Sequence, residues 1–300
     1  MSPGRARPPI SEPSAPWIVV GAAGTLGQDV VAAAREAGRD VTALIRKELD
    51  VTDHEACAEV LTGAGVVVNC AAFTRVDDAE EHEADAFAVN AVGAANLARA
   101  AAAAGARLVQ PSTDYVFAGD AGTPYPEGAP VAPRSAYGRT KAAGEWAVLA
   151  ASPDNLVLRT AWLYGAGGVN FPRTIVRVVQ ERGTAAVVDD QRGQPTWTRD
   201  VADLLLRLLD ARAPGGVYHA TSSGDATWFD FARAAVASAG LEPESVRPTT
   251  SAAFVRPAPR PAYSVLGHGA LRRAGIEPIG DWRARWAEAA PSVLALNSAT

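Results

Sequence analysis

The feature that most constrains the fold is a short apolar strand that runs directly into a glycine-rich turn and a helical segment. Residues 17–20 read WIVV, which is typical of a buried parallel strand. Gly21, Gly24 and Gly27 follow at regular spacing, and an alanine-rich segment continues to residue 38. Glycine allows a backbone to approach a pyrophosphate, and a helix N-terminus offers it free N–H groups. This order of parts predicts a dinucleotide-binding turn, with an ordinary tight strand–helix turn as the alternative.

Strands and helices continue to alternate along the first half of the chain. Such alternation indicates right-handed crossovers and a parallel, doubly wound Rossmann sheet of the α/β class. Ligands bind at the carboxyl ends of the strands in sheets of this kind. We expect further strands at residues 40–45, 66–72, 106–117 and 155–165, and helices at 55–64 and 84–105.

The chain divides into three parts. Residues 1–16 contain five prolines and no apolar core segment, so we expect a disordered tail there. Residues 17–167 carry the alternating pattern and form the predicted NAD(P)-binding Rossmann domain. Residues 168–300 are expected to form mainly a smaller substrate-binding domain, from which some segments, such as 216–221, return to the sheet.

Composition excludes several classes of function. The net charge is -5 and there is no basic block, so we expect no nucleic-acid partner. No apolar run reaches the roughly 18 residues that a membrane-spanning helix needs, and residues 1–16 do not read as a secretory signal. Cys57 and Cys70 are too few for a disulfide scaffold, and no Cys/His cluster has metal-ligand spacing. These features predict a cytoplasmic protein without a membrane or metal partner.

The end of the second expected strand points to the cofactor. In many dinucleotide sites an acidic residue about 20 residues after the glycines binds the ribose 2′-hydroxyl of NAD. Here the sequence reads LIRKELDVTD, so Arg46 and Lys47 stand in place of the acid. A guanidinium suits a 2′-phosphate, which favours NADPH, with NADH still possible. A solvated basic turn is the alternative, and Asp50 and Val51 are placed to flank the adenine.

A tyrosine and a lysine four residues apart form the clearest catalytic pair. Lysine occurs only at Lys47 and Lys141, and in a helix Lys141 lies one turn beyond Tyr137 on the same face. A free tyrosine has a pKa near 10 and is a poor acid or base at neutral pH. A nearby ammonium favours the phenolate, so we expect Lys141 to lower the pKa of Tyr137. The alternative is a surface tyrosine beside a surface lysine.

Several motifs occur in a fixed order along residues 17–290. GAAGTLG, NCAA, STDYVF and YGRTK together resemble the extended short-chain dehydrogenase/reductases. RTAWLYG, NFPRTIVR, DDQRGQPTWTRDVA, GVYHATSSGDATWFDFA and RPAYSVL follow one another as in the dTDP-4-dehydrorhamnose reductase family, so the chain resembles that family more closely. The glycine and tyrosine–lysine motifs are common to the superfamily, whereas STDYVF and DQRGQPT are more specific.

The resemblance implies reduction of the C4 ketone of a dTDP-4-keto-6-deoxyhexose, giving dTDP-L-rhamnose or a related deoxysugar of a secondary-metabolite pathway. Tyr137 is then the general acid, Lys141 tunes it and binds the nicotinamide ribose, and Thr113 hydrogen-bonds the carbonyl oxygen. The expected cofactor-binding residues are Gly21, Gly24, Thr25, Leu26, Gly27, Arg46, Asp50, Val51, Ala71, Ala72, Thr74, Tyr137 and Lys141.

The resemblance also implies residues for the sugar and its nucleotide. Arg75, in the FTRVD loop, stands where the family more often has a small residue, which bears on the hexose that binds. The expected substrate-binding residues are Thr74, Val76, Thr113, Tyr115, Trp162, Asn170, Arg173, Gln191 and Arg260.

Further expectations concern metal, assembly and alternative functions. Some members of the family bind magnesium through glutamates at a dimer contact, but the matching positions here hold Asp29 and Arg199, so we predict no metal site. We expect a monomer or a homodimer. A non-catalytic regulatory subunit is one alternative, which the intact Thr–Tyr–Lys set disfavours. A nucleotide-sugar epimerase or dehydratase is another, but a dehydratase needs an acidic pair after the catalytic hydroxyl, and here only Asp114 is acidic before Tyr115.

Overall fold

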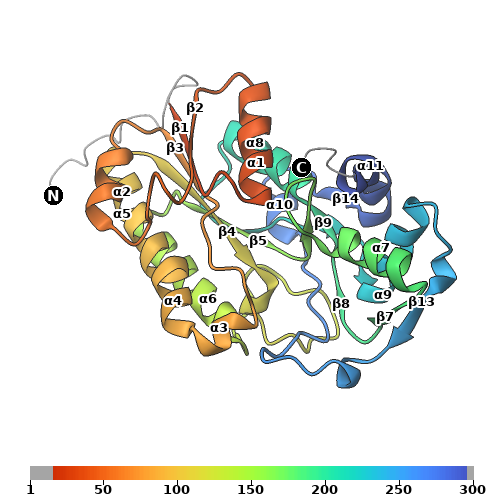
Figure 1. Ribbon diagram of the computed structural model, residues 1–300. Helices are drawn as coiled ribbons and strands as arrows, with labels where there is room; N and C mark the ends of the chain where they lie inside the picture. The colour runs from red at the N-terminus through yellow and green to blue at the C-terminus, as the bar shows by residue number, and fades with distance from the viewer. Residues whose placement is uncertain (1–15, 296–300) are drawn as a thin grey trace, which may run out of the picture.

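The centre of the molecule is a parallel sheet of six strands, shown in the computed structural model of Figure 1, which describes residues 16–295. Every strand pair in this sheet is parallel, so the predicted α/β class is confirmed. The tail predicted at residues 1–16 lies outside the described residues, except for Pro16. In sheet order the strands are β10 (Gly216–His219), β5 (Leu156–Thr160), β4 (Arg107–Thr113), β3 (Val66–Asn69), β1 (Trp17–Val20) and β2 (Val41–Leu44).

Helices cover both faces of the sheet. Because successive strand residues point to opposite faces, Trp17 and Val19 of β1 pack into one core, while Ile18 and Val20 pack into a second. A parallel sheet with two buried faces explains why its strands read as continuous apolar runs. The helices of the first core are α1 (Thr25–Glu36) and α8 (Thr198–Asp210), and those of the second are α2 (His54–Val60), α5 (Ala94–Ala104) and α6 (Ala136–Ala151).

The strand order changes direction between β1 and β3. From β1 the chain passes to β2 on one side, crosses back to β3 on the other, and continues outward to β4 and β5. β10 comes from the C-terminal half of the chain and completes that edge by pairing with β5. Such a reversal leaves a crevice at the carboxyl ends of β1 and β3, where doubly wound folds bind their ligands.

The long helix expected at residues 84–105 is confirmed, but it contains a π-helical turn that the sequence does not predict. It consists of α4 (Glu83–Phe87), the π-helical segment η1 (Ala88–Gly93) and α5, which follow one another without a gap. π-Helical turns inside longer helices are frequent at functional sites. This one carries Asn90, whose contacts are described below.

Two expected strands are shorter than predicted. The segment 155–165 breaks at Trp162, whose φ of 45° is uncommon for a residue with a side chain, and β6 (Leu163–Tyr164) follows the break. The segment 106–117 leaves the sheet after Thr113 and forms the 3₁₀ turn η2 (Asp114–Val116). Both breaks fall at carboxyl ends of neighbouring strands, so the irregular backbone lies at the ligand-binding edge of the sheet.

A smaller lobe with an aromatic core lies beside the sheet, on the right of Figure 1. Its centre is Phe231, whose ring centroid lies 5.2 Å from those of both Tyr164 and Trp286. The helices around this core are α7 (Phe171–Arg182), α9 (Trp228–Ser238) and α11 (Trp282–Leu294). Short strands pair as β6 with β9 (Thr196–Trp197), β7 (Ala185–Val188) with β13 (Val246–Thr249), β8 (Arg192–Gly193) with β12 (Ala226–Thr227), and β11 (Ser222–Ser223) with β14 (Ile279–Asp281). The remaining short elements are α3 (Asp78–Glu81), α10 (Gly269–Arg273), η3 (Pro243–Ser245) and η4 (Ser251–Ala253).

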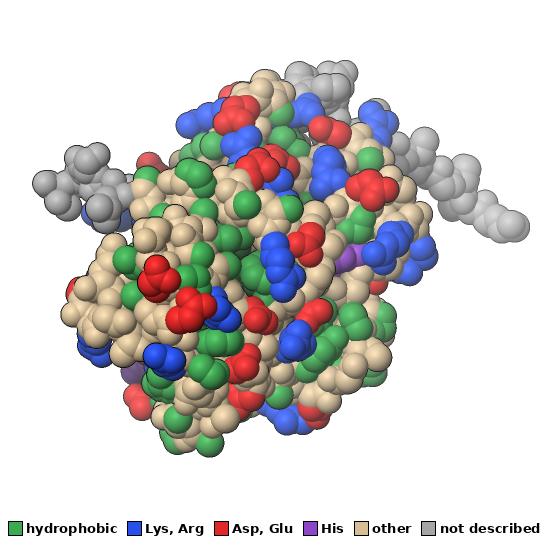
Figure 2. Space-filling model, turned by 90° about the vertical axis from the view of Figure 1, so that its right-hand side faces the viewer, with side chains coloured by type: hydrophobic (Ala, Val, Ile, Leu, Met, Phe, Trp, Pro, Cys, Tyr) green, Lys and Arg blue, Asp and Glu red, His purple; other side chains and the backbone are tan. Residues whose placement is uncertain are grey.

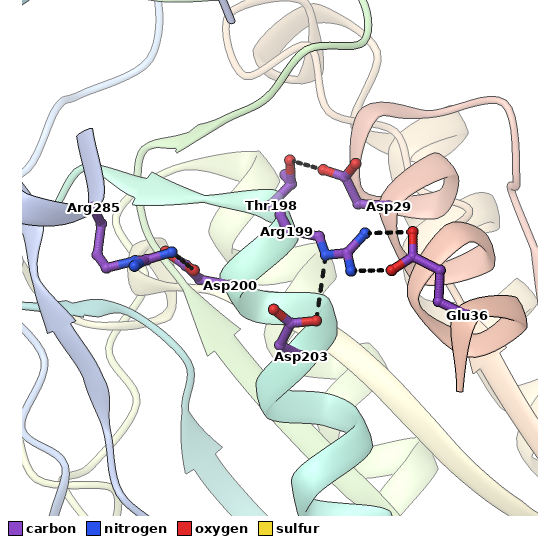
Figure 3. Close-up of polar contacts among 7 residues, drawn as sticks. All are labelled: Asp29, Glu36, Thr198, Arg199, Asp200, Asp203 and Arg285. Carbon is purple, nitrogen blue, oxygen red and sulfur yellow. Dashed lines mark hydrogen bonds and ion pairs between the residues drawn. The ribbon is translucent and has the colours of Figure 1, made fainter. Parts of the chain in front are cut away.

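Charged contacts fasten α8 to α1 (Figure 3). Arg199 donates to both carboxylate oxygens of Glu36, one of them at 3.1 Å, and lies 3.3 Å from Asp203 one turn along α8. The hydroxyl of Thr198 donates to Asp29 at 2.5 Å. Asp29 and Arg199 thus each contact a side chain of the neighbouring helix.

The opposite side of α8 is fastened to α11 (Figure 3). Arg285 donates to both carboxylate oxygens of Asp200, at 2.9 and 2.7 Å. Asp200 is only 7% exposed, so this two-bond contact satisfies a nearly buried carboxylate. Helix α8 therefore connects the covering layer of the large sheet to the smaller lobe.

The visible surface carries charges of both signs. On the face shown in Figure 2, acidic and basic side chains are interspersed. Among residues 16–295, no helix has the length and apolar character needed to cross a membrane. Both cysteines are free thiols, Cys57 buried and Cys70 half-buried.

Candidate active site

A cavity of about 660 Å³ opens at the carboxyl ends of β1, β2 and β3. This volume is in the range of pockets that hold small ligands and cofactors. The cavity lies at the crevice where the strand order reverses. The predicted cofactor-binding residues that line it are Gly21, Gly24, Arg46, Asp50, Val51, Ala71, Ala72 and Thr74.

The three glycines of the turn are required for different reasons. A Cβ on Gly21, where φ is 76°, would lie 2.5 Å from the backbone nitrogen of Ala71, and a Cβ on Gly27 would lie 2.4 Å from the carbonyl oxygen of Gly21. Packing of the turn itself therefore excludes side chains at these two positions. A Cβ on Gly24 would meet only the Gly21 carbonyl, at 3.4 Å, and Gly24 lines the cavity. The absent side chain there leaves the first turn of α1 open to a pyrophosphate.

Thr25 and Leu26 have only backbone groups to offer a ligand. The hydroxyl of Thr25 donates to the carbonyl oxygen of Gly167 at 2.9 Å. The side chain of Leu26 belongs to the buried core beneath α1. Their N–H groups lie in the first turn of the helix, where they add to its positive end.

The segment after β2 forms the outer rim of the cavity. Arg46 is exposed there, and Asp50 lines the same rim. Asp50 accepts hydrogen bonds from the N–H and the hydroxyl of Thr52, at 2.9 and 2.8 Å. These bonds, and secondarily the charge of Arg46, lower the pKa of Asp50, so it remains a carboxylate that shapes the turn.

The loop after β3 forms the inner wall and is held by a buried asparagine. Asn90 accepts a hydrogen bond from the Phe73 N–H at 2.9 Å and donates to the Phe73 carbonyl at 3.1 Å. It also donates to the hydroxyl of Thr140 on α6, at 3.0 Å. The π-helical turn thus ties the loop that carries Thr74 and Arg75 to the helix that carries Tyr137.

Tyr137 stands in the first turn of α6 with its phenol against the hydroxyl of Thr113. Desolvation, together with the nearby Asp114 carboxylate, raises the pKa of Tyr137 to about 12, while hydrogen bonding with Thr113 acts in the opposite direction. The expected net lowering of this pKa is therefore wrong, because loss of hydration around the phenolate dominates. A neutral phenol at this position is a proton donor over the whole physiological range.

Lys141 lies one turn beyond Tyr137 and is buried. Its Nζ donates to the carbonyl oxygen of Pro111 at 2.7 Å. Burial lowers the pKa of Lys141 to about 8, while Glu145 one turn further along α6 acts to raise it. Cys70, which lines the inner end of the cavity, is electrostatically coupled to the same ammonium. The ammonium of Lys141 is therefore close enough to the cavity wall to act on one of its residues.

A buried ion pair fixes this face of α6 against the sheet. Glu145 accepts two hydrogen bonds from Arg159 of β5, at 2.9 and 2.7 Å, and one from the hydroxyl of Ser112 on β4, at 2.5 Å. Both ionic side chains are at most 5% exposed. A buried pair with its hydrogen bonds made holds one geometry, because breaking it leaves an uncompensated charge. It thereby positions α6 relative to the strand that presents Thr113.

Tyr115 and Arg260 meet beside the catalytic tyrosine. The rings of Tyr115 and Tyr137 make an edge contact, with centroids 5.7 Å apart. Arg260 donates to Asp77 at 2.9 Å, and both charges act on the phenol of Tyr115, whose pKa is raised mainly by burial. The proline-rich segment of Arg260 is thus tied to the loop that carries Val76, next to the catalytic group.

Trp162 forms part of an aromatic stack at the end of β5. Its ring lies parallel to that of Trp228, with centroids 3.7 Å apart. A Cβ on Gly193 would lie 2.5 Å from the Trp162 ring, so the glycine of the DQRGQPT motif makes room for this side chain. Because Thr160 pairs with Thr113 across the sheet, Trp162 follows the strand next to the catalytic hydroxyl.

Three predicted substrate residues make structural contacts. Asn170 caps α7 by accepting from the Arg173 N–H at 3.0 Å. The Arg173 guanidinium donates to the carbonyl oxygens of Val293 and Ala166, which holds the C-terminal helix against α7. Gln191 donates to the hydroxyl of Ser251 at 2.8 Å. These contacts describe how the three side chains are held in the protein, and their roles in binding the nucleotide diphosphate remain predictions.

Other residues belong to the site although the sequence motifs did not single them out for it. Asn90 gives one signal, since it and Asn96 are the two amides in an alanine-rich helical stretch. Asp77 and Trp228 give no signal in the sequence. Asp77 contacts Arg260 and Trp228 stacks on Trp162, and each partner is more than 60 positions away in the chain. Asp114 could have been found from its place directly after Thr113.

Known proteins match this chain over nearly its whole described length. A family model described as RmlD substrate binding domain matches residues 17–294. The probable dTDP-4,6-dihydroxy-2-methyloxan-3-one 4-ketoreductase of Streptomyces antibioticus is 51% identical over 289 residues, 93% of this chain and 96% of the relative. The dTDP-4-dehydrorhamnose reductase of Streptomyces griseus is 49% identical over 284 residues, 92% of this chain and 93% of the relative.

A solved structure agrees with these sequence matches. The dTDP-4-dehydrorhamnose reductase of Bacillus anthracis, crystallised in complex with NADP, superposes with a TM-score of 0.89 at 34% identity, covering 92% of this chain and 98% of that one. The likeness spans both the parallel sheet and the smaller lobe. With its sequence matched along 278 residues and its fold matched throughout, this chain belongs to the RmlD substrate-binding-domain family, the family of the dTDP-4-dehydrorhamnose reductases.

Proposed function

We propose that this protein is an NADPH-dependent oxidoreductase that reduces the C4 ketone of a dTDP-4-keto-6-deoxyhexose. The observation that carries the proposal is that Tyr137 contacts Thr113 one helical turn from Lys141, in a member of this family. Lys141 acts electrostatically on Cys70, which lines the cofactor-sized cavity. The names of both close relatives describe enzymes that act on dTDP-linked keto sugars. The substrate proposed first is dTDP-4-dehydro-L-rhamnose, with dTDP-L-rhamnose as the product.

The cavity suits NADPH. The bare backbone at Gly24 and the first N–H groups of α1 would hold the pyrophosphate, and Arg46 would pair with the 2′-phosphate. Asp50 and Val51 line the wall proposed for the adenine, and Ala71, Ala72 and Thr74 line the way to the nicotinamide end. NADPH, when bound, supplies the hydride that reduces the ketone. The Bacillus anthracis relative was crystallised with NADP, which supports this choice.

The protein supplies the proton and stabilises the charge that develops on oxygen. Tyr137 donates its phenolic proton to the ketone oxygen as that oxygen becomes an alkoxide. The neighbouring Thr113 hydroxyl donates a hydrogen bond to the same oxygen, which orients the carbonyl. Lys141, charged below pH 8, stabilises the phenolate that remains and is placed to hold a ribose hydroxyl of the cofactor.

The side chains proposed to hold the substrate include Tyr115, whose ring contacts that of Tyr137. Tyr115 and Trp162 offer aromatic walls for the hexose, and the loop with Thr74 and Val76 closes another side. Arg260, half-buried and paired with Asp77, is the cation proposed for the nucleotide diphosphate.

Reduction is favoured over dehydration on this scaffold. Only Asp114 is acidic after Thr113, and its carboxyl is buried against hydroxyl groups. The next residue is the phenol of Tyr115. A regulatory role is disfavoured because the tyrosine, the lysine and the hydroxyl stand together as proton transfer requires.

The test is the loss of NADPH absorbance with dTDP-4-keto-6-deoxyglucose as substrate, in the presence and absence of a 3,5-epimerase, with products identified by NMR. Turnover only with the epimerase identifies a rhamnose-type reductase. Turnover without it identifies a reductase of the unepimerised sugar. No turnover in either arm, with NADPH bound normally, would contradict the proposal for these sugars.

A further inference from the structure

Asp114, the acidic residue beside the Thr113 hydroxyl, takes no direct part in the proposed reduction. Asp114 is the first residue of η2, and its side chain is 2% exposed. Its Oδ1 lies 3.0 Å from the Thr113 hydroxyl oxygen, which donates to an ionised carboxylate and accepts from a protonated carboxyl, and the hydroxyl of Ser264 also acts on the carboxyl. Its Oδ2 is fully buried and has no partner in regular hydrogen-bond geometry. A buried charged oxygen without a partner is costly, so these surroundings favour a protonated carboxyl.

Thr113 connects this carboxyl to the catalytic phenol. Its hydroxyl contacts both the Asp114 carboxyl and the phenol of Tyr137. A hydroxyl can accept one proton while it donates another, so carboxyl, hydroxyl and phenol form a continuous path for a proton. The backbone supports the path, since Thr113 ends β4 and also accepts the Tyr115 N–H at 3.2 Å, which fixes its rotamer.

The carboxyl is closed to the substrate. Oδ2 is fully buried, and Oδ1 is occupied by Thr113. Asp114 therefore cannot serve as a direct acid to the sugar, as the acidic pair of a dehydratase does. Any effect on the reaction has to pass through Thr113 to Tyr137.

We propose that Asp114 returns to Tyr137 the proton that the tyrosine gives to the ketone. After reduction the substrate carries a C4 hydroxyl and Tyr137 is a phenolate. With the carboxyl proton on Oδ1 and the Thr113 hydroxyl turned toward the phenolate, the Oδ1–H bond breaks as its proton moves to the Thr113 oxygen, while the Thr113 hydroxyl proton moves to the phenolate. Tyr137 and Thr113 are then neutral, Asp114 is a carboxylate, and a proton from solvent restores it. This inference rests on the proposed ketone reduction.

The protonation of this group is expected to change near neutral pH. Burial raises the pKa of Asp114 to about 6, against hydrogen bonds from Ser264, from Thr113 and from backbone N–H groups. The titratable groups that face it are the phenols of Tyr115 and Tyr137, which stay neutral because burial raises the pKa of both. Arg260 and Asp77 act on Tyr115 from the substrate side. Lys141 belongs to the same machinery and titrates separately, since its pKa is lowered to about 8.

The experiment compares wild type with Asp114→Asn, which keeps an acceptor for Thr113 but carries no acidic proton. We would measure kcat from about pH 5 to pH 9 with NADPH and the keto sugar both saturating, so that titration of the cofactor 2′-phosphate, with a pKa near 6, affects KM alone. Wild-type kcat is expected to fall as pH rises through about 6 and to fall again near 8. In Asp114→Asn we expect no fall in kcat near pH 6, while the fall near pH 8 remains. At pH 5 we expect kcat of this variant to be lower than that of wild type by about tenfold or more.

Controls separate this effect from misfolding. Asp40→Asn, which changes an exposed carboxylate before β2, is expected to keep the wild-type profile. NADPH binding by Asp114→Asn, measured by fluorescence, reports whether the variant is folded. Infrared difference spectra of wild type minus Asp114→Asn follow the carboxyl directly, and we expect a carboxylic acid band that disappears as pH rises through about 6.

The outcomes distinguish the inference from the proposed function. If wild type turns over and kcat of Asp114→Asn still falls near pH 6, Asp114 does not return the proton to Tyr137. The assignment as a reductase would stand in that case. A loss of activity that is equal at every pH would overturn the proton return as well, because a purely structural carboxyl gives that result. No infrared band that titrates near 6 would overturn it whether or not the enzyme turns over. Absence of turnover by wild type with every keto sugar would instead remove the proposed function.

Discussion

The ionisation of Tyr137 and Lys141 is governed by burial more than by neighbouring charges. Desolvation is the largest cause of the raised pKa of Tyr137 and of the lowered pKa of Lys141. The raised pKa of Tyr137 keeps a proton on its phenol. Because the pKa of Lys141 is lowered to about 8, its ammonium loses the charge at a pH close to neutral. The site therefore has a neutral acid next to a cation over most of the range in which a cell operates, which suits proton donation to an alkoxide.

Replacing the lysine tests this arrangement. Lys141→Met removes the cation and the hydrogen bond to Pro111 but keeps the length of the side chain. We expect kcat to fall by roughly 10²- to 10⁴-fold at pH 7, with thermal stability retained, because a desolvated charge is removed. Since the pKa of Lys141 is lowered to about 8, the lysine is charged below that pH, and wild-type turnover should fall as pH rises above it. Steady-state kinetics across pH measures both effects.

An exposed cation on the same helix is the matched control. Arg139→Met removes a guanidinium that pairs with Glu83 at the surface of α6. We expect it to leave the pH profile as in wild type. Unchanged turnover in Lys141→Met would contradict the role given to the lysine.

For single residues, the sequence predicts which side chains form the candidate site better than it predicts their pKa values. Tyr137 and Lys141 are found from their helical spacing and from the rarity of lysine in the chain. The raised pKa of the tyrosine is not predictable in this way. It depends on burial by residues from several strands and on Asp114, whose closeness to Tyr137 only the tertiary fold provides.

Among the secondary-structure elements, the segments after β1, β2 and β3 form the site. The apolar runs that predict these strands also fix which loops meet at the carboxyl edge, since all of them are parallel. The sequence therefore locates Gly24 and Arg46 in the cofactor cavity without side-chain detail. It does not predict the π-helical turn, because Asn90 and Phe73 interact only after β3 and α6 pack together.

Reversing the charge after β2 tests the cofactor preference. Arg46→Asp places a carboxylate on the cavity rim where the guanidinium lies. A carboxylate repels a 2′-phosphate and accepts a hydrogen bond from a 2′-hydroxyl, so we expect the Kd for NADPH to rise by about tenfold or more while that for NADH changes little. Fluorescence titration with both cofactors measures this. Equal weakening of both would contradict 2′-phosphate recognition by Arg46.

Removing the amide that holds the inner loop tests the role of the π-helical turn. Asn90→Ala leaves the N–H and carbonyl of Phe73 without their partner, at a cost of roughly 1–3 kcal/mol of unfolding free energy. Because the freed loop lines the cavity, we also expect a higher KM for NADPH. Urea denaturation and initial-rate kinetics report the two effects.

The control for this variant is another buried asparagine. Asn155→Ala removes bonds to Leu108 and Val148, at the opposite end of β4 and β5 from the site. It should lose a similar amount of stability with the KM for NADPH unchanged. An equal rise in KM in both variants would show that Asn90 acts only through overall stability.

Over the whole molecule, two lobes meet across α8. Arg285 pairs with the nearly buried Asp200 on one side of that helix, and Arg199 pairs with Glu36 on the other (Figure 3). The sequence predicts the parallel sheet but not the four small strand pairs of the second lobe, because strands of two to four residues carry little periodic signal. Nor does it predict that the Arg173 guanidinium donates to the carbonyl oxygen of Val293 in the C-terminal helix, because that contact spans 120 positions of the chain.

Breaking the contact between α8 and α11 tests whether the Arg285–Asp200 pair connects the two lobes. Arg285→Ala leaves the Asp200 carboxylate without its two hydrogen bonds, so we expect a loss of roughly 1–3 kcal/mol in unfolding free energy. Arg283→Ala, a neighbouring arginine that lies over the Trp282 ring, is the control and should cost less. Urea denaturation midpoints compare them. Equal midpoints for wild type and Arg285→Ala would contradict a connecting role for this pair.

The measurement that bears most directly on the proposed reaction is turnover of wild type and Tyr137→Phe, side by side, with NADPH and the dTDP-4-keto sugar that wild type reduces. Phenylalanine keeps the ring contact with Tyr115 and removes only the proton donor. We predict that kcat falls by roughly 10²- to 10⁴-fold while the Kd for NADPH, measured by fluorescence, changes little. Wild-type turnover in Tyr137→Phe would contradict the assignment of Tyr137 as the acid that completes the reduction.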